Sequence, residues 1–350
     1  MLCTLLLPDL FLPRAVHDDA YRDLQLPALE RLLSRSDSTT LPGQGFEAWL
    51  CQAFGAAPQP DWPVAALTLL VDRGGDDDGG FWLRADPVHL RATRDRVLLS
   101  DASVLSIRPE EADTLVAALN AYFADDTRQF FALHPQRWYL RLNAHPQIAT
   151  RTLLEAIGKD IHPLLPAGPQ ALYWHRMANE IQMLLHAHAV NEARAERGDP
   201  IINSVWLWGG GHLPSISTGG FHGLWSKDAL ALGLARNAGL PAAPNGDAPG
   251  PWLESVTRAA RGGHHLVVLD QLMLPARHGD LPMWRERLAR LEQEWFAPLL
   301  RAVRDRRVTR LNIAAIGPDR GVRFEVTPVA LLRVWRAGAP LAAHAATHTA

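Results

Sequence analysis

The chain has 350 residues, of which 47% are hydrophobic and 21% charged, as is ordinary for a globular protein of one or two domains. Its formal net charge of −2 gives no global basic field, so we expect no nucleic-acid partner. No apolar run approaches the roughly 18 to 20 residues that cross a bilayer, so we expect no membrane segment.

The N-terminal part of the sequence predicts a βα opening. Cys3 to Leu7 is an apolar run that suits a buried strand, and Leu24 to Leu33 has helical spacing of leucines. A second apolar run, Val64 to Val71, leads into a polar, glycine-rich stretch. Within that stretch, the consecutive residues Asp76–Asp78 lack the alternating pattern of a calcium loop and favour a solvated turn. We therefore expect residues 1–75 to be the first part of a core.

The middle of the chain predicts a compact α+β unit. Phe81 to Asp101 contains short alternating stretches typical of strands, and Trp138 to Asn143 is a further strand candidate. Glu110 to Phe123 has Leu115, Leu119 and Phe123 on one helical face. We assign residues 76–165 to an inserted cap domain.

The remaining chain returns to an α/β alternation. Ala171 to Arg197 predicts one long helix, and Ile201 to Trp208 predicts a strand that enters the glycine loop 209–211. Later strands are expected over Leu266 to Asp270, Leu311 to Gly317 and Val322 to Val326, and helices over Ala229 to Leu240 and Met283 to Val303. Residues 166–340 should form the second part of the core, and residues 341–350 a disordered tail.

Several local patterns suggest binding residues and exclude common catalytic motifs. Asn191 and Arg194 are three apart on a helix, so together they could bind an oxyanion or cap a neighbouring strand. Arg84 and Asp86 lie on one side of a predicted strand, where an exposed ion pair is the simplest interpretation. The glycine loop 209–211 precedes no Gly-Lys-Ser/Thr, and no G-x-G-x-x-G or G-x-S-x-G occurs. A P-loop, a Rossmann fingerprint and a serine-hydrolase elbow are therefore not indicated.

Metal-ligand residue types are sparse. Cys3 and Cys51 have neither zinc-site nor disulfide spacing, which favours a reducing, cytoplasmic compartment. His186 and His188 would point about 200° apart on a helix, which disfavours a shared metal. The cluster of ligand types near a strand end comprises His264, His265, Asp270, His278 and Asp280, and a solvated histidine loop is the competing interpretation.

Two segments resemble a known family. His188 to Arg194 and Asn203 to Gly211 resemble the N-x-x-R and N-x-x-W-x-W-G-x-G segments of the archaeal-type cofactor-independent phosphoglycerate mutases, and Leu83 to Asp86 resembles a segment of their inserted domain. The resemblance covers roughly residues 80 to 240. It implies an α/β fold with an alkaline-phosphatase-like, mostly parallel sheet flanked by helices and an inserted α+β cap domain. It also implies a ligand site lined by Arg84, Arg141, Asn191, Arg194, Asn203 and His212.

The departures from that family concern its catalytic groups. The family begins with an aspartate-glycine metal motif and offers a Ser-Asp nucleophile, whereas this chain has Asp9 followed by Leu10 and no serine or threonine between Gly43 and Ala48. The family's Asp-x-x-x-His corresponds to Leu274 through His278, with only the histidine present. Asp9, Asp270 and His278 remain as metal candidates, too few for a two-metal site.

The sequence most resembles a divergent branch of the family, the RpfE-type regulatory proteins. This resemblance implies a degenerate, regulatory protein that binds a small anionic, phosphorylated ligand or a protein partner without catalysis. An active metal-dependent phosphoglycerate mutase or phosphatase, using manganese, zinc or magnesium, is the alternative. A third possibility is an interaction protein whose tryptophan-rich faces bury a partner, since the chain has 12 tryptophans.

Overall fold

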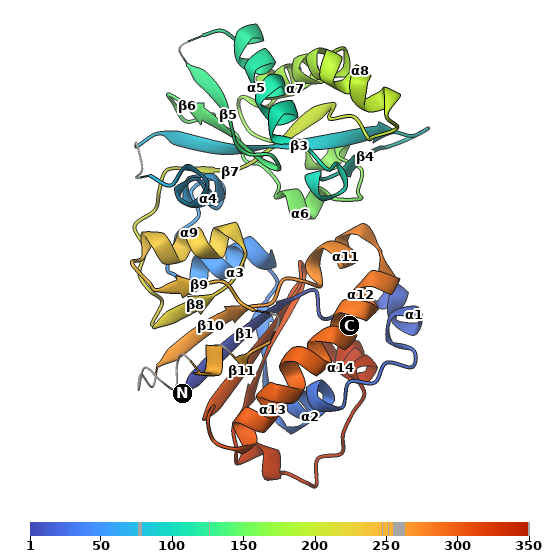
Figure 1. Ribbon diagram of the computed structural model, residues 1–350, viewed down its shortest axis with the longest axis vertical. Coiled ribbons are helices and arrows are strands. Elements are labelled where there is room, and N and C mark those ends of the chain that lie inside the picture. The colour runs from blue at the N-terminus through green and yellow to red at the C-terminus, as the bar shows by residue number, and fades with distance from the viewer. Residues whose placement is uncertain (76–78, 126, 247, 251, 255–262, 349–350) are drawn as a thin grey trace. The chain divides into compact units, whose positions relative to one another are not determined.

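The computed structural model describes residues 1–75, 79–125, 127–246, 248–250, 252–254 and 263–348 (Figure 1). The chain divides into two compact units, one of residues 1–55 with 216–350 and one of residues 56–215. We call the first the core unit and the second the inserted unit. Each is described by itself.

The core unit is built on a seven-stranded sheet. Its strands in spatial order are β2 (Asp37–Pro42), β12 (Arg320–Val326), β11 (Arg310–Ile316), β1 (Leu2–Pro8), β10 (His264–Val268), β8 (Gly223–Trp225) and β9 (Ala242–Ala243). The pairs from β11 to β9 are parallel, whereas β12 pairs with β11 and β2 in antiparallel fashion. The predicted α/β class with a mostly parallel sheet is confirmed.

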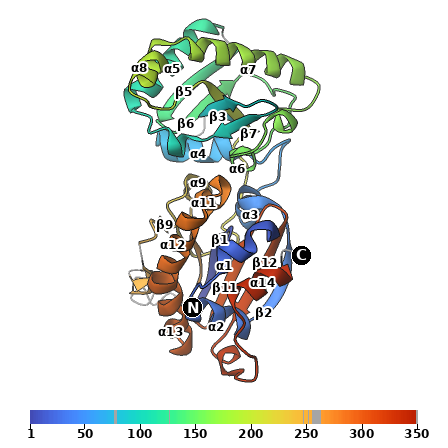
Figure 2. The ribbon, with the colours of Figure 1, turned by 90° about the vertical axis from the view of Figure 1, so that its right-hand side faces the viewer.

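Both faces of this sheet are covered. Cys3, Leu5 and Leu7 of β1 join one hydrophobic core, while Leu6 on the opposite face is also fully buried. This explains the uninterrupted apolar run of β1, because a central parallel strand has no solvent-facing side. Figures 1 and 2 show the helices beside the sheet. They are α1 (His17–Tyr21), α2 (Pro27–Arg35), α3 (Gly45–Ala53), α9 (Ala229–Asn237), α11 (Met273–His278), α12 (Leu281–Leu291), α13 (Ala297–Arg304) and α14 (Leu341–His348).

The inserted unit has an antiparallel sheet between helices. Its strands are β3 (Phe81–Ala92), β4 (Val97–Ser100), β5 (Arg128–His134), β6 (Arg137–Leu142) and β7 (Ser204–Gly211), with the long β3 pairing with β4, β6 and β7. Helices α5 (Pro109–Tyr122) and α7 (Ala171–His186) share a core with one face. Helix α4 (Val64–Arg73) packs on Trp82 and Tyr139 of the other face.

Three expectations differ from the structure. The inserted unit begins at residue 56 and ends at 215, rather than spanning 76–165, because α4, α7 and β7 pack within it. The long helix over 171–197 is interrupted, since His188 caps the N-terminus of α8 (Ala189–Glu196) and accepts a hydrogen bond from the Val190 amide. The expected disordered tail contains α14, which buries Leu341 and Ala345; residues 349–350 and the turn at 76–78 lie outside the described residues.

No helix within the described ranges is both long and apolar enough to cross a bilayer.

Candidate functional site

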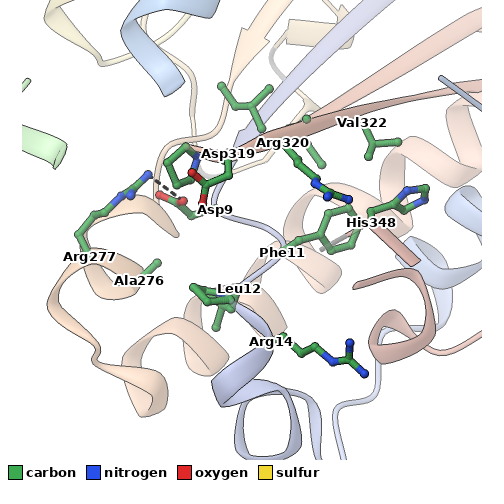
Figure 3. Close-up of a pocket in the computed structure, with 16 residues that line it drawn as sticks. Asp9, Phe11, Leu12, Arg14, Ala276, Arg277, Asp319, Arg320, Val322 and His348 are labelled. Carbon is green, nitrogen blue, oxygen red and sulfur yellow. Dashed lines mark hydrogen bonds and ion pairs between the residues drawn. The ribbon is translucent and has the colours of Figure 1, made fainter. Parts of the chain in front are cut away.

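A pocket of about 250 Å³ lies at one edge of the core-unit sheet (Figure 3). Strands β1 and β11 are parallel neighbours, so the loops that follow them, which begin at Asp9 and Gly317, emerge at the same edge. Open α/β sheets commonly bind ligands outside the carboxyl ends of their strands. The charged residues that line this edge pocket are Asp9, Arg14, Arg277, Asp319 and Arg320.

Hydrogen bonds fix the backbone of Asp9, but only one of its two carboxylate oxygens has a partner among the described residues. Its φ of 55° is left-handed, which aspartate tolerates better than most residues. Its amide donates to the Ile316 carbonyl at 2.8 Å, and its carbonyl accepts from the Trp284 indole at 3.0 Å. One carboxylate oxygen, Oδ1, accepts from Arg277 Nη2 at 3.0 Å. The other, Oδ2, is buried without a hydrogen-bond partner among the described residues.

Burial and pairing act in opposite directions on the charge of Asp9. Burial raises the pKa of Asp9 to about 6, and the Arg277 guanidinium opposes that rise. Arg277 lies in the last turn of α11, and its Nε is buried without a partner in the part of the chain that is described. Figure 3 shows the two side chains facing each other. The pair therefore has one unused acceptor and one unused donor beside the pocket.

The segment expected to hold a nucleophile, Gly43 to Ala48, begins next to the same edge. Gly43 follows β2, and a Cβ added there would lie 1.8 Å from the Asp319 carbonyl oxygen. Only glycine fits so close an approach of two backbones. A serine or threonine at residue 43 is thus excluded by packing.

The donor set does not fit a two-metal centre. The described residues contain no group of three or more histidine, cysteine, aspartate or glutamate side chains that could hold a metal ion. Asp9, Asp270 and His278 are therefore not united in one metal site. Burial raises the pKa of Asp270, which follows β10, and Leu274 lies in α11. Within this edge, Arg277 supplies the positive charge next to Asp9.

Asn191 and Arg194 bind the backbone of the inserted unit. The Asn191 amide group donates to the carbonyls of Leu185 and Ile202 at 2.7 and 2.8 Å and accepts from the Ile202 amide at 2.7 Å. Arg194 pairs with Glu111 at 2.6 Å and donates to the carbonyls of two loop residues, Leu105 and Pro200. Both side chains are 1% exposed. These contacts favour strand and loop capping, one of the two alternatives that the sequence left open.

The ion pair between Arg84 and Asp86 is buried, which corrects the expectation of an exposed pair. Arg84 is 5% exposed and Asp86 is fully buried. Helix α4 covers this face of the sheet, and its Thr68 hydroxyl accepts from Arg84 Nη1 at 3.4 Å. Sequence alternation placed the two side chains on one face but gave no sign of the helix above them.

The remaining ligand candidates also have partners inside the inserted unit. Asn203 accepts from the Leu90 amide at 2.7 Å and donates to the Leu90 carbonyl at 2.8 Å. His212 shares a hydrogen bond of 3.1 Å with the Gly80 carbonyl. Arg141 donates to Asn143 at 3.3 Å and lines a polar pocket with it. The six candidates are thus spread over the inserted unit rather than gathered around one cavity.

The charged lining of the edge pocket was largely missed by sequence reasoning. Of its five charged residues, only Asp9 was singled out. Arg277 lies within the segment Leu274 to His278, of which only the histidine resembles the family's pattern. The usable signal was topological, because Arg14 and Arg277 occur in short helices after the parallel strands β1 and β10, and Arg320 begins β12 after the loop that follows β11.

Comparisons with known proteins support the family resemblance. No family model matches the chain. A probable 2,3-bisphosphoglycerate-independent phosphoglycerate mutase of Geobacter sulfurreducens is 28% identical over 185 residues, 51% of this chain and 44% of that protein. The 2,3-bisphosphoglycerate-independent phosphoglycerate mutase of Methanosarcina barkeri is 28% identical over 158 residues, 44% of this chain and 39% of that protein. The matched region therefore spans less than half of each relative.

A solved structure extends the similarity to the fold of most of the chain. A protein from Pyrococcus horikoshii superposes with a TM-score of 0.57 and 14% identity, covering 93% of this chain and 87% of that one. At this identity the match shows the fold alone. Through about half of its sequence, then, the chain is related to the cofactor-independent phosphoglycerate mutases.

Proposed function

We propose that this chain is a phosphoglycerate-mutase-like protein that binds a small anionic, phosphorylated ligand in the edge pocket without turning it over. The observation that supports this most is the ion pair between Arg277 and Asp9 at the end of β1. A guanidinium can hold phosphate oxygens through its fork of donors. It has no coordination site, however, and so it cannot act as a Lewis acid on a directly bound oxygen, as a catalytic metal does.

The rest of the pocket suits an anion that is held rather than attacked. Arg14 and Arg320 line it from exposed positions, where they can reach a ligand that enters from solvent. No hydroxyl stands at Gly43 to accept a phosphoryl group, and a side chain at that residue is sterically excluded. Asp9 and Asp319 limit the net positive charge, which favours a small ligand over an extended polyanion.

The test combines metal content, turnover and binding. Elemental mass spectrometry of the purified protein should show no stoichiometric manganese, zinc or magnesium, and 3- and 2-phosphoglycerate should not interconvert with or without added manganese. Titration calorimetry should show binding of 2-phosphoglycerate that weakens about tenfold in the double variant Arg277→Gln, Arg320→Gln. The matched control is Arg301→Gln, an exposed arginine on α13, which should bind as the parent does.

The main alternative is an active metal-dependent phosphoglycerate mutase or phosphatase. It is favoured by the names of the sequence relatives, which are mutases. Stoichiometric metal together with turnover would establish it and overturn the proposal. The proposal also includes a regulatory role of the RpfE type, a protein partner and a cytoplasmic location. The binding experiments would be the first step towards testing these parts.

A further inference from the structure

The inserted unit contains a second pocket, of about 380 Å³, that the proposed function does not use. It is formed by α7, by the strands β3, β4 and β7, and by the loop from Ile161 to Pro166. Its volume lies in the range of pockets that enclose small organic ligands. We call it the α7 pocket.

Two indole rings line the α7 pocket with their polar atoms already satisfied. Trp174 and Trp206 are each 5% exposed. Their indole N–H groups donate to the carbonyls of Pro146 and Arg151, at 3.2 and 2.9 Å respectively. Because these donors are used elsewhere, what the two residues offer to a ligand is aromatic surface.

Three neutral polar side chains in the same lining lack partners. Asn179 and Gln182 are three apart on α7, so they share one face of the helix. Ser204, at the start of β7, is 3% exposed. Within the described ranges none of these three side chains makes a hydrogen bond. Asn179 is exposed and Gln182 half-buried, and a ligand in the pocket could supply the hydrogen-bond partner that each of the three groups lacks.

The lining of the α7 pocket contains no aspartate, glutamate, lysine or arginine among its described residues. The lining also contains two histidines, of which His162 is hydrogen-bonded to Asp160 and His175 to the Pro166 carbonyl, each at 2.8 Å. A cationic ligand would therefore find no carboxylate in the lining, and an anionic ligand no lysine or arginine. Amide and hydroxyl groups both donate and accept, which matches the mixed donors and acceptors along the edge of a nitrogen heterocycle. The edge pocket, with five charged residues, has the opposite chemistry.

We infer that the α7 pocket is a binding site for an uncharged, planar nitrogen heterocycle of about nucleobase size. The ring contacts Trp174 and Trp206, and its edge is read by Ser204, Asn179 and Gln182. This site is separate from the anion site of the core unit and does not depend on it.

The test uses fluorine NMR of protein labelled with 5-fluorotryptophan, with adenine, hypoxanthine and benzimidazole as probes. Loss of a signal in Trp206→Phe assigns the Trp206 resonance. At least one probe should shift that resonance saturably at submillimolar concentration. Ala178→Trp places an indole in the pocket and should weaken binding about tenfold or more. The matched control is Leu172→Trp, an exposed position on the same helix, which should bind as the parent does.

A second comparison keeps the test decisive if Ala178→Trp fails to fold. The double variant Ser204→Ala, Gln182→Ala removes polar partners but little volume, and should weaken the best probe several-fold while circular dichroism stays unchanged. Adenosine monophosphate should bind more weakly than adenine, because its phosphate finds no lysine or arginine in the lining. The inference is overturned if no probe shifts the Trp206 resonance at millimolar concentration, if the double variant binds every probe as the parent does, or if adenosine monophosphate binds more tightly.

Discussion

Each unit contains a buried arginine–aspartate pair, and the two pairs differ in how completely they are bonded. In the inserted unit, Asp86 accepts two hydrogen bonds from Arg84, at 3.1 and 2.6 Å, and one from the Trp208 indole at 2.7 Å. In the core unit, a single hydrogen bond of 3.0 Å joins Arg277 to Asp9. Among the described residues, neither Asp9 Oδ2 nor Arg277 Nε has a hydrogen-bond partner. We call Arg84–Asp86 the closed pair, because both carboxylate oxygens of Asp86 already accept hydrogen bonds. We call Arg277–Asp9 the open pair, because it lines a pocket and is bonded less completely.

This difference teaches that resemblance to a family's binding motif does not identify a binding site. The segments whose sequence resembles the phosphoglycerate mutases contain Asn191, Arg194 and Asn203, and all three are hydrogen-bonded to backbone groups, Arg194 also to a half-buried carboxylate. By contrast, Asp9 and Arg277, at the edge of the core sheet, each have a buried atom without a hydrogen-bond partner among the described residues. Counting buried polar atoms without hydrogen-bond partners distinguishes residues that stabilise the fold from residues that could bind a ligand, which sequence similarity does not.

The largest expected effect on stability comes from removing Arg84 from its ion pair with Asp86. Arg84→Met would leave Asp86 buried without its cation, so we expect the free energy of unfolding to fall by about 3–5 kcal/mol. Denaturant titration of the whole chain, followed by circular dichroism, measures this loss. The double variant Arg84→Met, Asp86→Leu should recover much of it, because both charges are then gone. A loss below about 1 kcal/mol in the single variant would show that the pair is solvated.

The open pair should instead make stability depend on pH. Because the pKa of Asp9 is raised to about 6 in the folded state, the folded protein binds this proton more tightly than the unfolded chain does. Its contribution is fully present below the unfolded pKa of about 3.9 and is lost as the pH rises through 6. Asp9→Asn should remove this dependence, worth up to about 3 kcal/mol, when urea midpoints are compared between pH 4 and 7. Equal changes in the urea midpoint of the parent and of Asp9→Asn between pH 4 and pH 7 would contradict this expectation.

The C-terminal helix gives an effect of intermediate size. Leu341 of α14 is 1% exposed and joins the core, so Leu341→Ala should lower the free energy of unfolding by about 2 kcal/mol. Leu332, which is 69% exposed, provides the matched control, and Leu332→Ala should change stability by less than about 0.5 kcal/mol. Equal effects in thermal unfolding would mean that α14 does not dock on the core.

The smallest expected effect on stability is at the mouth of the edge pocket. Arg14 is exposed, so Arg14→Gln should change the free energy of unfolding by less than about 0.5 kcal/mol. Its effect should appear in ligand affinity and in the salt dependence of binding, since a solvent-exposed cation acts over a distance that salt screens. Calorimetry with 2-phosphoglycerate at low and high salt separates these contributions.

Much of the fold could be predicted because its elements have strong periodic patterns. The uninterrupted run of β1 and the leucine spacing of α2 both correspond to elements of the structure. The unit boundaries could not be predicted, because α4 looks like any apolar helix and only its packing on Trp82 and Tyr139 assigns it to the inserted unit. The pairing of Arg277 with Asp9 joins residues 268 positions apart, which no local pattern reveals.

The order of strands in the core sheet has a consequence for synthesis on the ribosome. β1 emerges first, yet both of its neighbours, β10 and β11, begin at residues 264 and 310. The 160 residues of the inserted unit are complete before either neighbour exists. During synthesis, the backbone of β1 therefore has no neighbouring strand of the sheet to pair with while the inserted unit can already fold. Such non-local pairing slows folding, and an exposed apolar strand during the delay invites aggregation or chaperone binding.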